Sequence, residues 1–394
     1  MTSPDELLAA VERFVSETVL PEVDAWDRAD DLPDAVVAEL VSLGLTGALV
    51  PVEYGGAGFG VADLVPAWRA LSQGWISLTG AVNPTGLATA LLVRHGTEAQ
   101  RARWLPAIAS GKCVASFSIT EPQAGSDLGR IETSARLLDG GGLVLDGEKR
   151  WVAGGASSDV VFIMVEVDGS AKPSCVVLPA EGRDSASWRV EDLDKVGYRG
   201  VESAAYVFDS HEAPGAEILG GPDEGLGSGA RFMLDALDVG RVNVACRALG
   251  IVDRAIACAV EECRERAVGD GMLGEHTHAQ LRVGEMVARR AAVEALVDRA
   301  AAAVDARDGR AREDGVHDAG ALRDTARELS TAAKVTASDT AVWAVDRAAR
   351  LAASRSYAAG DELARLRRDA PQTQIGEGAN DALLLALSRP LLTD

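Results

Sequence analysis

Three short stretches of this chain combine residue types that can bind a cofactor and move a proton. The first, Ser118 to Asp127, places a threonine hydroxyl, a turn-forming proline and a backbone-exposing glycine within ten residues, a composition suited to a loop that holds a cofactor. The second, Lys149-Arg150-Trp151, follows soon after it. The third, Gln374 to Gly378, sets one carboxylate, that of Glu377, between two glycines near the C-terminus, where it could act as a base.

Together these stretches resemble the acyl-CoA dehydrogenase family of flavoproteins. The resemblance rests on Ser118-Ile119-Thr120-Glu121-Pro122-Gln123-Ala124-Gly125-Ser126-Asp127, on Trp151 and on the segment from Arg368 to Gly378, and it spans nearly the whole chain. Members of this family oxidise an acyl thioester: a glutamate removes a proton from the α-carbon while hydride leaves the β-carbon for flavin N5. The resemblance therefore implies FAD as cofactor and an acyl thioester of CoA or of an acyl carrier protein as substrate.

Glu377 is the catalytic base that the resemblance implies. Some family members carry the base on an earlier helix, just before an arginine, but that position here is Gly240, before Arg241. Gly376 and Gly378 leave room beside Glu377 for a thioester, and the backbone N–H of Glu377 is, by resemblance, a donor to the thioester carbonyl. The alternative interpretation is an ordinary exposed glutamate at a helix start.

The cofactor contacts implied by the resemblance lie mainly in the middle of the chain. Thr120 matches the threonine whose hydroxyl bonds the flavin, and Ser126 the serine that meets the substrate's pantetheine arm or the cofactor. Trp151 matches an aromatic residue that packs against the flavin ring, although a tryptophan in the core of a β-domain is the alternative. The full expected cofactor set is Phe117, Ser118, Ile119, Thr120, Gly125, Ser126, Trp151, Val152, Ala153, Arg266, Arg350, Ala379 and Asn380.

Two charged positions of the C-terminal part also match the family. Arg241, three residues after Asp238, matches an aspartate–arginine pair near the acyl pocket, and Arg266 matches an arginine that reaches the FAD pyrophosphate of a neighbouring subunit. Each could instead form an ion pair on a helix surface. The expected substrate contacts are Ser126, Asp238, Arg241, Gly376 and Gly378. Because the family completes the cofactor site across subunits, we expect a homodimer or homotetramer.

Several positions depart from the family pattern. Residues 267–272 lack the usual Phe-Gly and proline, so an aromatic contact to the adenine side is lost, and Arg350 stands where a glutamine is usual. Ala153 and Ala379 replace hydroxyl residues, and each lost hydrogen bond would weaken binding by about 0.5 to 1.5 kcal/mol. Gly376 stands where an aromatic often precedes the base, which predicts a polar or branched acyl group rather than a long straight chain.

Composition and periodicity divide the chain into three parts. Residues 1–112 repeat apolar side chains at helical spacing, broken by a glycine-rich turn at 51–58. Residues 113–222 carry short β-branched runs, and residues 223–394 are rich in strong helix formers. The prediction is a mainly α, α+β fold with an N-terminal helical domain, a β-barrel-like middle domain and a C-terminal helical bundle. The charged segment 305–316 is expected to be a solvated helix connection.

Charge and cysteine content exclude several classes of protein. Against 39 Lys and Arg stand 60 Asp and Glu, and the resulting charge of -21 repels nucleic acid and anionic membranes. Five cysteines without CxxC spacing argue against a disulfide framework and a zinc site, and no metal is expected. The chain shows no basic segment leading into an apolar one, and no apolar run near the roughly 18 residues of a membrane helix is expected, which predicts a cytoplasmic protein.

Three other functions stay open at this point. The same base and flavin could oxidise a hydroxyl- or amino-bearing carbon of a carrier-tethered unit. A flavin monooxygenase on the same fold normally lacks the glutamate, so Glu377 counts against that activity. The lost adenine contacts favour a flavin-free scaffold. The weakened motifs point to a specialised, secondary-metabolic pathway, and electrons would leave to an electron-transfer flavoprotein or to oxygen.

Overall fold

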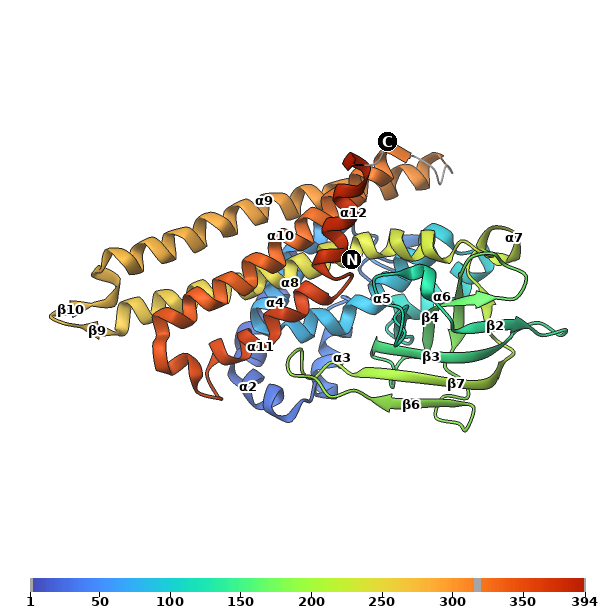
Figure 1. The fold of residues 1–394 in the computed structure, drawn as a ribbon, viewed down its shortest axis with the longest axis horizontal. Helices are drawn as coiled ribbons and strands as arrows, with labels where there is room; N and C mark the ends of the chain where they lie inside the picture. The colour runs from blue at the N-terminus through green and yellow to red at the C-terminus, as the bar shows by residue number, and fades with distance from the viewer. Residues whose placement is uncertain (1–2, 315–319, 393–394) are drawn as a thin grey trace.

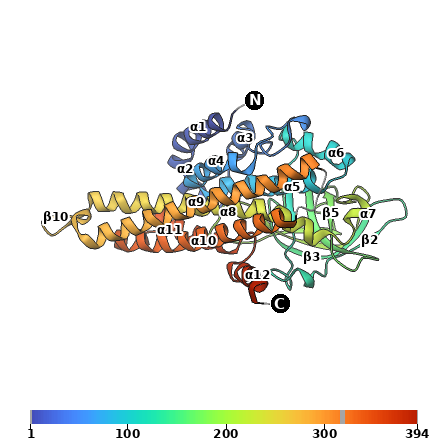
Figure 2. The ribbon, with the colours of Figure 1, turned by 90° about the horizontal axis from the view of Figure 1, so that it is seen from above.

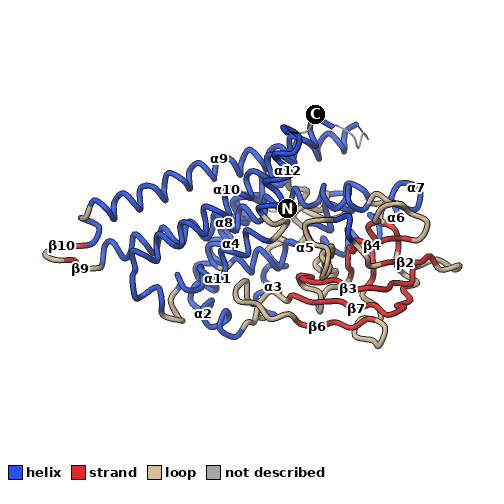
Figure 3. Tube along the Cα trace, in the orientation of Figure 1, coloured by secondary structure: helices blue, strands red, loops and turns tan. Residues whose placement is uncertain are grey.

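The computed structural model describes residues 3–314 and 320–392, with the large sheet at one end of an elongated helical body (Figures 1 and 3). The N-terminal helices are α1 (Pro4–Phe14), α2 (Leu20–Ala29), α3 (Asp34–Ser42), α4 (Val61–Gly74), α5 (Ile76–His95) and α6 (Glu98–Ala109). The first of them begins at a capping box, in which the Ser3 hydroxyl accepts from the N–H of Glu6, and buries Leu7, Val11 and Phe14 along one face.

The middle of the chain forms the sheet. Its strands are β1 (Ala115–Ser118), β2 (Ser134–Leu137), β3 (Leu143–Ala153), β4 (Val160–Val167), β5 (Ser174–Pro179), β6 (Trp188–Asp192), β7 (Ser203–Ala213) and β8 (Glu217–Ile218). Their order is β6-β7-β3-β2-β4-β5-β8, with β1 pairing in parallel with β4. This is an open path between β6 and β8, so the described strands form a barrel-like layer that does not close. Its core holds Trp188, fully buried against Tyr206 and Phe208.

The C-terminal part is a bundle of long helices. They are α7 (Gly221–Gly225), α8 (Gly229–Glu265), α9 (Thr277–Asp314), α10 (Gly320–Ala352), α11 (Glu362–Ile375) and α12 (Asn380–Leu392). The hairpin of β9 (Ala267–Val268) and β10 (Gly271–Met272) lies at the end opposite to the sheet (Figures 1 and 2). The predicted order of helical, β and helical parts is therefore confirmed.

The charged segment 305–316 differs from its prediction. Helix α9 continues through it to Asp314, and Val316 lies outside the described residues. The segment is also not simply solvated. Arg307 is buried and donates to Asp238 on α8, while Asp305 accepts hydrogen bonds from the N–H groups of Val61 and Ala62, where α4 begins. A charged sequence that is typical of a solvent-exposed segment can thus be partly buried when its charges have partners on other elements.

Helix α5 corrects a second expectation. By its length of 20 residues and its mean hydropathy of 1.4, it meets the criterion for a membrane span, although no such run was expected. However, 78% of its apolar window is buried inside this protein, which is typical of a core helix. The five cysteines are free, and four of them are buried.

Candidate active site

The loop after β1 is held by a buried ion pair. Lys149 Nζ lies 2.6 Å from Glu121 Oε1, and the two side chains are 0% and 1% exposed. The same carboxylate accepts from the N–H groups of Glu132 and Thr133, which closes the loop that carries Thr120. Burial lowers the pKa of Lys149 to about 8, although Glu121 opposes this shift. The pair fixes the loop backbone, because separating the two buried charges would leave each one without its partner.

Contacts from β3 bring the first and second chemical stretches together. The N–H of Arg150 donates to the Thr120 carbonyl at 2.8 Å, and Lys149 Nζ donates to the Ile119 carbonyl at 3.1 Å. Earlier in β1, the Ser116 hydroxyl donates to the Ala153 carbonyl at 3.0 Å. The segments 117–120 and 149–153 therefore form one continuous wall of the β-domain.

Trp151 lies in a bulge of this wall. The register between β3 and β7 shifts between Lys149 and Val152, and Trp151 takes a left-handed backbone with φ of 61°. Such a conformation is uncommon for a non-glycine residue and is typical of functional positions. The indole is 57% exposed. Trp151 is thus not a core tryptophan, a place that Trp188 fills, and its ring is available to a flat ligand.

Two hydroxyls of the wall have no hydrogen-bond partner among the described residues. Ser118 Oγ is buried without a hydrogen bond, and no hydrogen bond of the Thr120 hydroxyl is found within residues 3–314 and 320–392. A buried polar atom without a partner is costly unless a ligand or water satisfies it. Together with the exposed Trp151 ring, these atoms fit the hydrogen-bonding edge and the flat face of a flavin. Gly125 and Ser126 lie exposed on the adjoining loop.

Glu377 lies in a strained turn between α11 and α12. Its φ is 55°, and Gly378 after it has φ of 107°. Lys334 on α10 braces this turn: its Nζ donates to the Gly378 carbonyl at 2.6 Å and to Asn380 Oδ1 at 2.7 Å. Burial lowers the pKa of Lys334 to about 7, although the nearby Glu377 opposes this shift. The left-handed backbone persists because its surroundings fix it.

Asp339 braces the same turn from its two ends. Its Oδ1 accepts from Gln374 Nε2 at 2.7 Å, before the turn, and from Asn380 Nδ2 at 2.8 Å, after it. The Asn380 amide therefore points into the bundle, where its oxygen and nitrogen bond to α10, rather than toward the β-domain. A Cβ on Gly376 would lie 2.7 Å from Gln372 Nε2. Gln372 is therefore the side chain next to position 376, where the absence of an aromatic ring predicts a wider pocket.

The Glu377 side chain points inward, between α5 and α8. Asn83 Nδ2 donates to Glu377 Oε1 at 2.7 Å. A Cβ built on Gly240 would lie 3.0 Å from Glu377 Cδ, so the carboxylate occupies the space that a side chain at position 240 would need. Glu377 is half-buried and is not an ordinary glutamate on the outer surface.

Helix α5 connects the carboxylate to the wall of the β-domain. Two residues after Asn83, the Thr85 hydroxyl accepts from the N–H of Ala115 at 3.2 Å, at the start of β1. A second link joins α11 to the loop after β6, where the N–H of Tyr198 donates to Asp369 Oδ1 at 2.8 Å. The base and the flavin-type wall thus contact one short stretch of α5.

Substitution of Gly240 tests this arrangement. We expect Gly240→Ala to displace the carboxylate by a few tenths of an ångström and to slow proton removal about tenfold, because reaction rates fall steeply with misplacement. Gly284→Ala on α9 is the matched control, since a Cβ there meets nothing within 4 Å. Stopped-flow reduction of the bound flavin by a thioester measures both. Equal rates for the two alanine variants would contradict the placement.

The predicted aspartate–arginine pair is buried. Arg241 Nη1 donates to Asp238 Oδ1 at 2.9 Å, and Asp238 also accepts from Arg307 and Ser330. Arg241 Nε lies 3.4 Å from the carbonyl oxygen of Glu377. The pair is therefore part of the support for the Glu377 turn rather than an ion pair on a helix surface.

Two predicted cofactor residues lie far from the rest. Arg266 follows the end of α8, at the tip of the bundle opposite to the sheet (Figure 1). It donates to the Leu351 carbonyl at 2.9 Å, beside Arg350, whose guanidinium pairs with Asp346 at 2.7 Å. The fold thus brings Arg266 and Arg350 together but keeps them away from Thr120 of the same chain.

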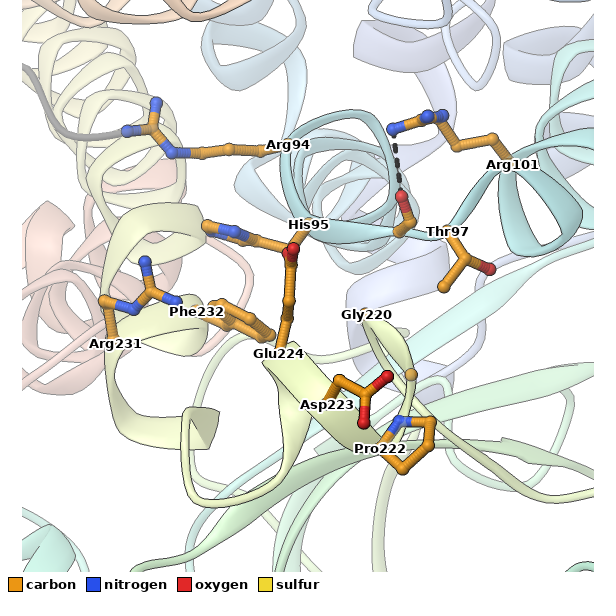
Figure 4. Close-up of a pocket in the computed structure, with 12 residues that line it drawn as sticks. Arg94, His95, Thr97, Arg101, Gly220, Pro222, Asp223, Glu224, Arg231 and Phe232 are labelled. Carbon is orange, nitrogen blue, oxygen red and sulfur yellow. Dashed lines mark hydrogen bonds between the residues drawn. The ribbon is translucent and has the colours of Figure 1, made fainter. Parts of the chain in front are cut away.

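Two cavities among the described residues lie apart from the predicted contacts. One, of about 610 Å³, lies between the end of α5 and the start of α8 (Figure 4) and is lined by Arg94, His95, Thr97, Arg101, Arg231 and Phe232 among others. The other, of about 690 Å³, is lined by Thr89, Ala90 and Val239 together with the start of α4. No predicted site residue lines either cavity, so the candidate site is the region around Glu377 and Thr120.

The residues that sequence reasoning missed are those that support the site. Asn83 and Lys334 contact the Glu377 turn from 294 and 44 residues away in the chain. Each is a polar residue within a run of apolar or small residues, and this pattern could have indicated a functional position in the sequence. The role of the Glu121–Lys149 pair was missed as well, although both residues stand in the stretches that were singled out.

Comparison with known proteins agrees with this order of helical and β parts. The N-terminal, middle and C-terminal domains of acyl-CoA dehydrogenases match residues 3–112, 116–211 and 227–392. An acyl-CoA dehydrogenase from Bacillus subtilis is 28% identical, over 97% of this chain and 96% of its own length.

Two solved structures are also similar. The butyryl-CoA dehydrogenase of Megasphaera elsdenii is 26% identical with a TM-score of 0.86, over 99% of this chain and 98% of its own. An acyl-CoA dehydrogenase of Bacillus anthracis, complexed with FAD, is 25% identical with a TM-score of 0.87, over 99% and 66%.

Proposed function

Because the chain belongs to the acyl-CoA dehydrogenase family, we propose that it dehydrogenates an acyl thioester carried by CoA or by an acyl carrier protein. Glu377 is the base that removes the α-proton. The observation that supports this proposal most is the inward carboxylate of Glu377, held by Asn83 on the helix that also contacts β1. A half-buried carboxylate beside an apolar helix can accept a proton without competition from bulk water.

FAD, when bound, supplies the acceptor for the hydride that leaves the β-carbon. The protein residues accept the α-proton and bind the thioester oxygen. Oε1 of Glu377 bonds to Asn83, and Oε2 has no hydrogen bond among the described residues, which leaves it to meet the α-proton. The backbone N–H of Glu377 has no carbonyl partner within the described chain, so it is available to the thioester oxygen. Such a donor favours the enolate-like transition state over the ground state.

The cofactor is held, in this proposal, by residues from two subunits. Ser118 and Thr120 bond the polar edge of the flavin ring and Trp151 covers its face, since these groups lack protein partners or lie exposed. Arg266 and Arg350 lie too far along the bundle to serve the same flavin and would contact the pyrophosphate in a partner subunit. The proposed assembly is therefore a homodimer or homotetramer.

Replacing Trp151 tests the ring contact. We expect Trp151→Ala to weaken FAD binding about five- to tenfold, because a stacked aromatic pair contributes about 1 kcal/mol. Since the indole is 57% exposed, the free energy of unfolding should change by no more than about 0.5 kcal/mol. Titration of FAD into the apoprotein measures the affinity. Leu137→Ala, an exposed apolar residue on β2, is the control, and equal FAD affinities would exclude a stack on Trp151.

The reaction itself is tested by anaerobic incubation with CoA- and pantetheine-bound acyl thioesters. We expect loss of flavin absorbance and a product that is two hydrogens lighter by mass. A protein that binds no flavin, or that no thioester bleaches, would contradict the proposal and favour a scaffold. Electron-transfer flavoprotein and oxygen are the acceptors to compare in turnover. The cytoplasm is the proposed location.

A further inference from the structure

Asn83 places an amide directly beside the proposed base. It is only 7% exposed and lies on α5 between apolar or small neighbours such as Val82 and Leu87. Its Nδ2 donates to Glu377 Oε1 at 2.7 Å, and because a carboxylate only accepts, the amide nitrogen must face it. This hydrogen bond orients the carboxylate and leaves its second oxygen for the substrate.

The other atom of the Asn83 amide is an acceptor without a partner. Glu377 is the one hydrogen-bond partner of this side chain within residues 3–314 and 320–392. Asn83 Oδ1 is not one of the fully buried polar atoms that lack a partner, so part of its surface is accessible. Gly240 and Leu87, which lie beside the Glu377 carboxylate, carry no donor in their side chains. The cationic groups near this carboxylate, Arg241 and Lys334, donate to other residues. The Tyr198 hydroxyl accepts from Arg247 Nη1 at 3.0 Å, and no hydrogen bond from it to Asn83 is found among the described residues.

We infer that Asn83 is a positioning and specificity residue, whose Nδ2 orients Glu377 and whose Oδ1 accepts a hydrogen bond from a hydroxyl or ammonium group on the α- or β-carbon of the acyl unit. The inference rests on the proposed function and narrows its substrate class. A carbon chain without such a donor would leave the amide oxygen buried and unpaired when the substrate excludes water. Sites built to bond a polar substituent discriminate strongly against analogues that lack it.

Binding of thioesters that cannot react tests the recognition alone. Pivaloyl-, 2-hydroxyisobutyryl- and 3-hydroxypivaloyl-pantetheine all lack an α-hydrogen, and they differ by a hydroxyl on the α- or the β-carbon. By calorimetry we expect the wild-type flavoprotein to bind one hydroxylated thioester about tenfold more tightly than pivaloyl-pantetheine, as one well-placed hydrogen bond allows. Asn83→Leu should abolish this ratio. Thr89→Val should retain it, because this buried hydroxyl of the same helix bonds, among the described residues, to the Thr85 carbonyl alone.

A second variant tests the orientation of the base and guards against misfolding of Asn83→Leu. Asn83→Asp keeps the shape but places a second carboxyl 2.7 Å from Glu377, and two adjacent carboxylates cannot both ionise easily. The cationic groups facing this pair are Arg241 on α8 and Lys334 on α10. The acidic limb of kcat/KM should therefore move to higher pH by one unit or more, which a merely structural role would not produce.

The outcomes separate the inference from the proposed function. If no thioester reduces the flavin of the wild-type protein, the proposed function fails. If thioesters reduce it, but the wild type binds the three unreactive thioesters equally or Asn83→Leu keeps the hydroxyl preference, only the inference is overturned. An unchanged pH profile in Asn83→Asp would exclude the orienting role.

Discussion

Replacement of Glu377 by glutamine is expected to slow the reduction of bound flavin by an acyl thioester by about 10³-fold or more, because a positioned general base contributes about 10²- to 10⁴-fold. Glutamine keeps the shape of the side chain and can still bond to Asn83. Flavin content and thermal stability should therefore remain as in the wild type. Rapid-mixing measurement of flavin absorbance under anaerobic conditions gives the rate.

A variant that carries the carboxylate at position 240 instead of 377 is the control for Glu377→Gln. The side chain of Glu377 occupies the space above Gly240, so a glutamate at position 240 with glycine at 377 should place its carboxylate in the same region. Glycine also relieves the left-handed backbone at 377, where φ is 55°. We expect the double variant Gly240→Glu, Glu377→Gly to recover part of the lost rate. A Glu377→Gln variant that retains most of the wild-type rate would exclude Glu377 as the base.

Replacement of Lys149 by methionine is expected to have the largest effect on stability. Lys149 and Glu121 are 2.6 Å apart and almost fully buried, so removal of the cation leaves a buried carboxylate without its charge partner. Breaking a buried pair in this way costs about 3 to 5 kcal/mol. Equilibrium unfolding in urea measures the change. Because the pair closes the loop that carries Thr120, the variant should also lose flavin more readily.

Arg150→Met is the matched control for Lys149→Met. Arg150 is the next residue of β3 and pairs with Glu148 at 2.8 Å, but these side chains are 40% and 34% exposed. Exposed pairs contribute about 0 to 1 kcal/mol. The double variant Glu121→Leu, Lys149→Met should cost less than the sum of its single changes, because it leaves neither charge unpaired. If Lys149→Met costs no more than Arg150→Met, the ion pair does not hold the loop.

The elements of this fold could largely be predicted, because each leaves a local pattern. The run from Val160 to Val167 reads as a buried strand and forms β4 with those bounds. For segment 305–316, the prediction of solvated side chains was wrong at Arg307, which is buried against Asp238 on another helix. A local pattern carries no information about partners that the tertiary fold supplies.

The candidate site shows the same limit. Thr120, Trp151 and Glu377 could be singled out from short motifs, but the direction of Trp151 depends on a bulge between β3 and β7. Asn83 reaches Glu377 across 294 residues of chain, and no spacing in the sequence indicates this contact. Residues that meet only in the folded chain need the structure to be found.

The most direct test of the account separates proton removal from hydride transfer. A 3,3-dimethylbutyryl thioester has α-hydrogens but no β-hydrogen, so the protein can remove its α-proton without oxidising it. In D₂O, we expect the wild-type protein to exchange α-hydrogen for deuterium, as read by mass spectrometry, and the Glu377→Gln variant to exchange it no faster than buffer. Equal exchange by the two proteins would contradict the claim that Glu377 removes the α-proton.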